Sequence, residues 1–434
     1  MKALCGKLEK FFLIFLFVNP FLDIIGGLYT KLSETYPLPG VSPSLLVRMA
    51  VLAVMALYLV LRHDWKAILT VVPVGAVYVL SVLLEVRDFY AISLSNDVQY
   101  IIRFGFNLTA LLCARRVFRE CGRSREELLH DLDRVFRFSA AVLALGIVLP
   151  YLFGVGYYTY GDRFGFRGCR GFFYSGNDIT AVMMMILPLT LAAFYRLGAL
   201  REAGWKRWLC HVLPPAFTVT ALLLIGTKTA FLSLGAVLAV AGLWALWRLI
   251  HRDGRPLLRF ACVMLAVLAT LLVLKLFAPS DVTKTISDSF EKPGNTAGEI
   301  GTVNTILSGR QIKLKNAFRM WKEALPLSAL VGVGRGTQRV VVEMDIFEVF
   351  LYYGVLGFAS MLWVYVLYGV RFLSRAFRRF DLQNLMLLVG VGLCVGYLLI
   401  AGHVLFSVTS GFWFALLLAY TELYNPRAPL PAQA

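Results

Sequence analysis

Long apolar runs, separated by short basic segments, dominate the sequence. Most of them reach the roughly 17–25 residues with which an α-helix crosses the hydrocarbon core of a bilayer. They lack the apolar–polar alternation of transmembrane β-strands, so the pattern favours helices. The sequence therefore predicts an all-α, polytopic membrane protein in which residues 1–434 form a single transmembrane domain. About twelve spans are predicted, at 10–29, 43–61, 67–84, 97–114, 135–154, 177–195, 209–226, 229–248, 258–277, 347–370, 384–401 and 404–423.

Basic clusters between the predicted spans indicate how the chain is oriented. They lie at Arg62–Lys66, Arg115–Arg137, Arg196–Arg207, Arg248–Arg259 and Arg371–Arg379. Lys and Arg accumulate in cytoplasmic loops of membrane proteins. If the N-terminus is cytoplasmic, all five clusters are cytoplasmic as well. We therefore expect both termini inside, with segments such as 155–176 and 278–346 on the extracytoplasmic face.

The segment 278–346 is predicted to be a long extracytoplasmic loop inserted between two spans. It begins with loop-forming residues, among them Pro279, Pro293 and Gly294. Over Gly309–Leu325, apolar residues recur with helical spacing, at Leu314, Phe318, Trp321 and Leu325. We expect this amphipathic helix to lie along the membrane surface or to cap the helix bundle.

Composition agrees with a membrane protein and narrows the chemistry. The chain is 59% hydrophobic and 16% charged, and its mean hydropathy is +0.72. The net charge of +17 would suggest nucleic acid in a soluble protein, but cytoplasmic basic loops explain it better here. The seven cysteines are scattered, and no His/Cys cluster or glycine-rich nucleotide loop is evident. We therefore predict no metal, no cofactor and no nucleic-acid partner.

Charged residues in or near the outer halves of spans need an explanation, because ionisable groups are costly in hydrocarbon. Asp23, Arg48, Arg103 and Lys228 are of this kind. Snorkelling or an internal ion pair would explain any one of them, whereas their gathering on one side points to a functional site.

Basic residues also crowd one predicted outer loop, at Arg163, Arg167 and Arg170. Guanidinium groups bind phosphate oxygens through two parallel hydrogen bonds, so this loop suggests an anionic ligand. Lipid headgroups are the alternative ligand.

Three carboxylates, Glu343, Asp345 and Glu348, lie at the mouth of a predicted span. A half-desolvated acid in such a position can act as a general base. If the segment is helical, Glu343 shares a face with Phe347, and Asp345 shares one with Glu348. The alternative is that these acids only stabilise a helix N-terminus.

The order of these features resembles the O-antigen ligase and O-antigen polymerase superfamily of membrane glycosyltransferases, over roughly residues 160–360. Gly171-Phe-Phe-Tyr-Ser-Gly-Asn177 is similar to the family's segment that opens a span with an asparagine. Gly226-Thr-Lys228-Thr-Ala resembles its short basic turn. Gly309-Arg310, followed by Trp321, Pro326-Leu327 and Gly332-Val-Gly334, resembles the family's outer-loop pattern of Arg, Trp and Gly-Val-Gly.

The resemblance implies an enzyme that transfers a glycan from a polyprenyl diphosphate to an acceptor hydroxyl at the outer leaflet of the bacterial cytoplasmic membrane. No metal or nucleotide sugar is required. Its partners are the lipid-linked donor, the glycan acceptor, membrane lipids and other membrane proteins of polysaccharide assembly. Lys228 and Arg310 fall at the positions of the family's functional basic residues, which implies diphosphate binding and leaving-group stabilisation. Arg167 and Arg170 are added as substrate-binding candidates on charge alone. Asn177, from the segment that opens a span, and Arg335 are the other substrate-binding candidates.

The sequence departs from the ligase pattern in two places. The basic turn carries Lys228 rather than arginine, which keeps the charge and loses the two-point contact. The position at which ligases typically carry a His-Asn pair, counted back from Gly354, holds Glu343. Glu343 is therefore the first candidate for the general base and Asp345 the second. This substitution favours polymerisation of lipid-linked units over ligation to another acceptor.

Two other functions fit parts of the sequence. A multi-span transporter or flippase of lipid-linked or charged solutes would also contain intramembrane charges, but it often shows internal repeats, and none is evident. A non-catalytic membrane scaffold would tolerate neutralisation of the outer charges.

Overall fold

The computed structural model describes residues 2–38, 41–87, 94–161, 167–197, 204–289, 310–335, 342–377, 381–402 and 404–424. Helices account for most of these residues, as predicted. Ten described helices are long and apolar enough to cross a membrane. They are α1 (Lys2–Ser33), α2 (Pro43–Leu61), α3 (Trp65–Arg87), α5 (Arg125–Leu152), α6 (Gly176–Arg196), α8 (Trp205–Ile225), α9 (Lys228–Ile250), α10 (Arg255–Phe277), α15 (Asp345–Ala376) and α16 (Leu382–Ile400).

Two of the twelve predicted spans are not among these ten helices. The span predicted at 97–114 lies in α4 (Leu94–Glu120), which is long but carries polar residues such as Arg103 and Asn107. The span predicted at 404–423 contains only α17 (Ser410–Tyr420), followed by the 3₁₀-helix η2 (Thr421–Tyr424). The prediction of a continuous helix from 404 is therefore wrong, because residues 404–409 are not helical.

Side chains from two other helices replace the hydrogen bonds that a helix would have formed over 404–409. The Asn107 side-chain amide donates to the carbonyls of Leu405 and Ser407, at 2.9 Å each. Asp345 Oδ2 accepts the backbone N–H groups of Val404 and Leu405 at 2.6 and 2.7 Å. Non-helical backbone at membrane depth is tolerated where protein satisfies its polar groups, and this segment meets that condition.

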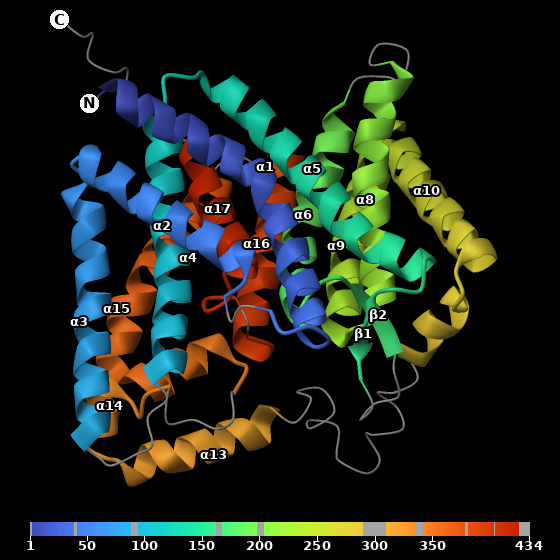
Figure 1. Cartoon of the computed structure of the whole chain (residues 1–434). Coiled ribbons are helices and arrows are strands. Elements are labelled where there is room, and N and C mark those ends of the chain that lie inside the picture. Colours follow the sequence, from blue (N-terminus) through green and yellow to red (C-terminus); the bar gives the residue numbers. More distant parts are fainter. Residues whose placement is uncertain are drawn as a thin grey trace, which may run out of the picture.

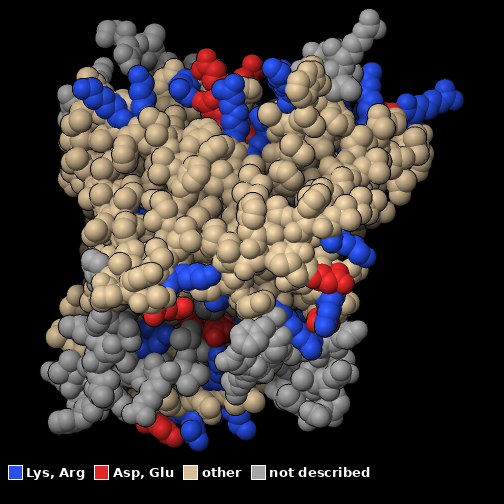
Figure 2. Space-filling model, turned by 45° about the vertical axis from the view of Figure 1, so that its right-hand side comes forward, with Lys and Arg blue, Asp and Glu red and all other residues tan. Residues whose placement is uncertain are grey.

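The helix α6 lies at the centre of the bundle, and other helices cover it. In the apolar 18-residue stretch of α6, 94% is buried inside the protein, compared with 17% in that of α3 and 22% in that of α10. Leu69, Leu83, Leu265 and Leu276 are exposed on these two peripheral helices. Figure 2 shows a broad belt with few charged side chains between two charged ends of the molecule. The peripheral helices thus present the apolar surface that lipid would cover.

The end of the bundle opposite the two termini carries the short elements (Figure 1). A two-stranded antiparallel hairpin, which the sequence did not predict, joins β1 (Tyr157–Tyr160) to β2 (Arg167–Gly171). The predicted amphipathic helix is confirmed as α13 (Arg310–Glu323), and α14 (Leu327–Val331) follows it. In α13, Phe318 stacks on Trp321, whose ring lies 5.5 Å from that of Phe350 in α15.

A kink at Gly354 shapes the start of α15. Gly354 has φ +64°, and a Cβ there would lie 2.4 Å from the Leu330 carbonyl, so only glycine fits. The kink makes two carbonyls of α15 available to the loop after α14. Val333 N–H donates to Leu351 O and Gly334 N–H to Tyr352 O, at 3.0 Å each. The Gly332-Val-Gly334 loop is therefore hydrogen-bonded to the first turns of α15, which carry Asp345 and Glu348.

Candidate active site

Arg310 and Glu343, two of the residues proposed from sequence for catalysis, form an ion pair. Arg310 Nη2 lies 3.2 Å from Glu343 Oε2, and Lys313 Nζ lies 2.7 Å from Glu343 Oε1. Glu343 precedes α15 and has φ +62°. The condition for Glu343 and Phe347 to share a face, a helix that includes Glu343, is therefore not met. Its position outside the helix lets its carboxylate reach the start of α13.

A cavity of about 240 Å³ lies beside this ion pair, and we call it the basic cavity. Lys228, Arg310 and Arg170 line it, and none of the described lining residues is acidic. Lys228 and Arg310 are close enough for their charges to interact. Asn177, from the segment proposed to open a span, lies in the same wall. The cavity therefore gathers four of the eight residues proposed from sequence.

Two helix N-termini also line the basic cavity. α6 begins there at Gly176, with Ser175 as its N-cap accepting the Asp178 N–H at 3.2 Å. α9 begins there at Lys228, with Thr227 as its N-cap. The first N–H groups and the positive end of a helix dipole favour anions. Two such ends together with three cations form an environment suited to a phosphate-sized anion.

Residues of the hairpin form one side of the basic cavity, and burial there shifts the pKa values of two of them. Arg170 in β2 lies over the Tyr157 ring, 5.3 Å from its centroid, and burial lowers the pKa of its guanidinium. Burial raises the pKa of Tyr160 in β1, and the charge of Arg310 partly opposes this shift. Arg167 lies on the same strand as Arg170 but lines another cavity, and its side chain donates to Asp288 O at 2.9 Å. The structure therefore places these two loop arginines apart, and Arg163, the third of the predicted loop, lies outside the described residues.

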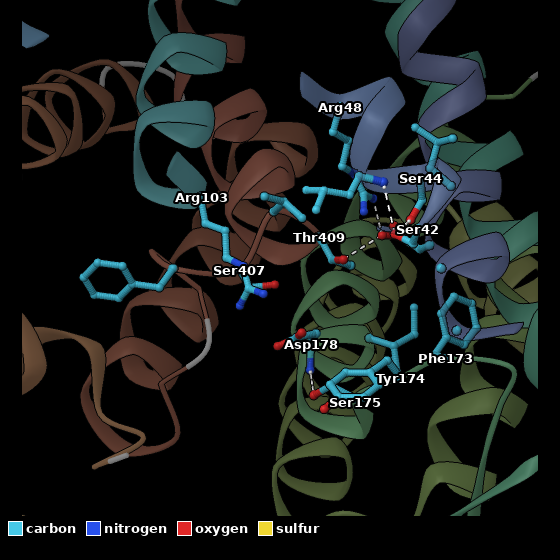
Figure 3. A pocket seen from close by; sticks show the side chains of 18 of the residues that line it. Ser42, Ser44, Arg48, Arg103, Phe173, Tyr174, Ser175, Asp178, Ser407 and Thr409 are labelled. Carbon is cyan, nitrogen blue, oxygen red and sulfur yellow. Dashed lines mark hydrogen bonds and ion pairs between the residues drawn. The ribbon is translucent and has the colours of Figure 1, made fainter. Parts of the chain in front are cut away.

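A second cavity of about 360 Å³, which we call the acidic cavity, is lined by Glu343, whereas its partner Arg310 lines the basic cavity. Ser175 lines both cavities. Figure 3 shows Arg103 extending into the acidic cavity opposite Tyr174, Ser175 and Asp178. Aromatic side chains form part of the wall. The charged lining residues are Asp23, Arg48, Arg103, Asp178, Glu343, Asp345 and Glu348.

The carboxylates of the acidic cavity differ in their hydrogen-bond and ion-pair partners and in their exposure. Asp345 is 1% exposed, and its Oδ2 accepts the two N–H groups of 404 and 405, while its role as the second candidate base stays a prediction. Glu348 accepts the Glu343 N–H at 2.8 Å. Asp23 pairs with Arg48, which is the internal ion pair considered from the sequence, and it also accepts the Thr409 hydroxyl at 2.6 Å. The side chain of Glu343 is 27% exposed, whereas the other three acids named here are buried.

Arg335, proposed from sequence as a substrate-binding residue, lies outside the described linings of both cavities. It is 6% exposed and packs over the rings of Tyr100 and Tyr352, at 4.5 and 5.5 Å from their centroids. Its guanidinium also donates to the Tyr100 hydroxyl at 3.2 Å. Because Tyr100 lines the acidic cavity, Arg335 contacts a wall of that cavity from behind. A direct contact of Arg335 with substrate remains a prediction.

Sequence reasoning did not select several residues that the structure places in the site. Lys313 follows Arg310 by one helical turn, and this i, i+3 spacing after a candidate residue was a usable signal. Ser175 and Asp178 flank the selected Asn177. Tyr397, whose hydroxyl donates to the Asn177 carbonyl at 3.0 Å, gave no such signal, since it lies 220 residues further along the chain. Among the described residues, no group of three or more His, Cys, Asp or Glu could hold a metal ion.

The family model of O-antigen ligase like membrane proteins matches residues 5–287 and 280–424. The chain belongs to this family. The family match confirms the resemblance drawn from the ordered motifs, and it includes the basic turn at Lys228 and the acidic residues at 343–348. The O-antigen ligase-like protein is therefore a membrane enzyme of cell-surface glycan assembly. A search of the curated proteins finds no match.

Proposed function

We propose that this O-antigen ligase-like protein polymerises or ligates glycan units carried on polyprenyl diphosphate, at the outer leaflet of the bacterial cytoplasmic membrane. The observation that carries the proposal is the Arg310–Glu343 ion pair, which joins a cavity suited to an anion with a cavity that contains a candidate base. The reaction needs these two environments side by side. The hairpin and α13 then face the outside, and the two termini lie in the cytoplasm.

In the proposed reaction, the basic cavity holds the donor diphosphate. Lys228 and Arg310 compensate the negative charge that develops on the diphosphate as the bond between the sugar C1 and the phosphate oxygen breaks. The N-termini of α6 and α9 add fixed partial positive charge at the same place. The lipid diphosphate leaves with the electron pair of the broken bond.

The acceptor enters the acidic cavity, and its hydroxyl oxygen attacks C1 of the donor sugar. Glu343 accepts the hydroxyl proton as the new glycosidic bond forms. Arg310 pairs with Glu343 when the diphosphate is not bound, so donor binding competes for the guanidinium and frees one carboxylate oxygen. Lys313, at 2.7 Å from the other oxygen, keeps the carboxylate in position. Donor binding would thus precede activation of the base.

The residue at position 343 also bears on the choice between polymerase and ligase. Glu343 occupies the place at which ligases typically carry histidine, which favours a second lipid-linked repeat unit as the acceptor. We therefore expect the product to be a longer lipid-linked glycan.

The test uses the purified full chain in detergent with extracted lipid-linked repeat units. We expect the wild type to form longer chains, and K228M, R310M and E343Q separately to lose most of this activity at unchanged protein level. R119M is the matched control, because Arg119 lies at the far end of α4 and is half exposed. A transporter makes no new bond, so absence of product from an active preparation, or wild-type chain length in all three variants, would refute the proposal.

A further inference from the structure

The acidic cavity contains one arginine whose charge no described side chain neutralises. Arg103 extends from α4 into this cavity (Figure 3). Among the described residues, none forms an ion pair or a hydrogen bond with its side chain. Asp178 lies across the cavity, and no ion pair joins the two. Arginines inside membrane proteins face such cavities or pair with other groups, and they often mark substrate pathways.

The carboxylates around Arg103 are held by other groups. Asp23 is bound by Arg48, Glu343 by Arg310 and Lys313, and Asp345 by two backbone N–H groups. Asp178 lies in the first turn of α6, where the helix N-terminus stabilises its charge. Arg103 is thus the cation of the cavity that is available to a ligand.

The cavity also limits what that ligand can be. Its volume of about 360 Å³ is at the lower end of the roughly 300–1,000 Å³ range of ligand pockets. It can accommodate the terminal sugar of an acceptor, but not a whole repeat unit with its diphosphate at the far end. Tyr100, Tyr174 and Phe406 provide flat surfaces for a sugar ring, and Glu343 lies in the same wall.

We propose that the acidic cavity is the acceptor subsite and that Arg103 binds a carboxylate on the terminal acceptor sugar. This inference rests on the proposed function and specifies its substrate class as an acidic glycan. A guanidinium group matches a carboxylate through two parallel hydrogen bonds. A carboxylate carries one negative charge, which balances the one positive charge of the available arginine. A terminal phosphate would bring further negative charge next to five carboxylates, which is unfavourable.

The first test is the composition of the polymer made by the wild type in cells that carry the complete assembly pathway. The sugar whose hydroxyl is glycosylated in the polymerisation step should carry a carboxyl group. A neutral sugar at that position would overturn the inference. This measurement needs no variant, so it does not depend on the folding of one.

The second test compares two acceptors with the purified full chain. One is the lipid-linked repeat unit as isolated, and the other is the same material after its carboxyl groups are reduced to hydroxyls. Charge-assisted hydrogen bonds contribute enough to predict that the wild type prefers the acidic acceptor in kcat/KM by roughly 10- to 100-fold. R103M should use both acceptors equally poorly, and R103K should keep part of the preference.

The control for this comparison is R119M, which removes an arginine from the cytoplasmic end of the same helix and should keep the wild-type ratio. An R103M ratio equal to the wild-type ratio would overturn the role of Arg103 and leave the proposed function intact. If the wild type extends neither acceptor, the proposed function and this inference both fail. The two failures are therefore distinguishable.

Discussion

Replacing Glu343 by glutamine should separate catalysis from stability. A general base contributes typically 10²–10⁴-fold in rate, which is about 2.7–5.4 kcal/mol of activation free energy at 1.36 kcal/mol per tenfold. The ion pairs of Glu343 join side chains that are 11–32% exposed. Ion pairs near the surface contribute about 1 kcal/mol or less each. E343Q should therefore lose at least 100-fold in kcat while its melting temperature changes little.

The assay is the rate of chain extension at saturating substrate in detergent, measured together with thermal unfolding of the same preparation. The matched comparison is D345N, because Asp345 is buried and accepts two backbone N–H groups. Hydrogen bonds to charged groups contribute about 1.5–3 kcal/mol each, so D345N should lower the melting temperature, and its activity should fall with its stability. If E343Q stays within tenfold of the wild type while D345N is stable and inactive, Glu343 is not the base and Asp345 takes its place.

Three further predictions concern the basic cavity, the kink and the thiols. K228R should keep most activity, because it preserves the charge, whereas K228M should lose roughly 10²–10³-fold in kcat, as for removal of one donor to a developing oxyanion; equal rates would exclude a role for this charge. G354A should destabilise the fold by at least about 1–2 kcal/mol in denaturant unfolding, because alanine is strained at φ +64°; the control G369A has no atom within 4 Å of its added Cβ and should be neutral or stabilising. Burial raises the pKa of the Cys169 thiol to about 11, so its reactive thiolate is scarce at pH 7–8 and increases only towards that pKa. A maleimide at pH 7 should therefore label the exposed Cys210 and not Cys169, and labelling of Cys210 in intact cells by a membrane-impermeant reagent would contradict the proposed orientation.

The features that depend on local sequence could be predicted. Most spans follow from run length, and α13 follows from the apolar stripe that ends in Trp321. The enzyme hypothesis requires Lys228, Arg310 and Glu343 to lie close together. In the structure Arg310 pairs with Glu343 and lines the same cavity as Lys228. Charge on the outer side of the spans also led to Arg103 and to the Asp23–Arg48 pair, although not to their roles.

The features that depend on distant contacts could not be predicted. Glu343 lies outside the helix with φ +62°, and its carboxylate pairs with Arg310 and Lys313, contacts that helical periodicity does not contain. The segment 404–409 is non-helical because Asn107, about 300 residues earlier, binds its carbonyls. Arg335 was proposed from sequence as a substrate-binding residue, but its guanidinium packs over a ring of α4, which lies far from it in sequence, and over a ring of α15. Hydrophobic run length alone cannot distinguish a helix that begins at residue 404 from one that begins at residue 410.

The non-helical segment 404–409 has a consequence for how specificity can change over evolution. Phe406, Ser407, Val408 and Thr409 form one wall of the acidic cavity, yet they belong to no helix. Asn107 and Asp345 hydrogen-bond the backbone of this segment, so its conformation does not depend on helical hydrogen bonds. Phe406 packs on rings of α4 and α15, and Thr409 binds Asp23, so these two are tied to the helices. Substitutions at Ser407 and Val408 can reshape the cavity at less cost to the helical scaffold, as in loops that carry function on a rigid frame. Relatives that handle different glycans should therefore diverge at these positions while retaining Asn107 and Asp345.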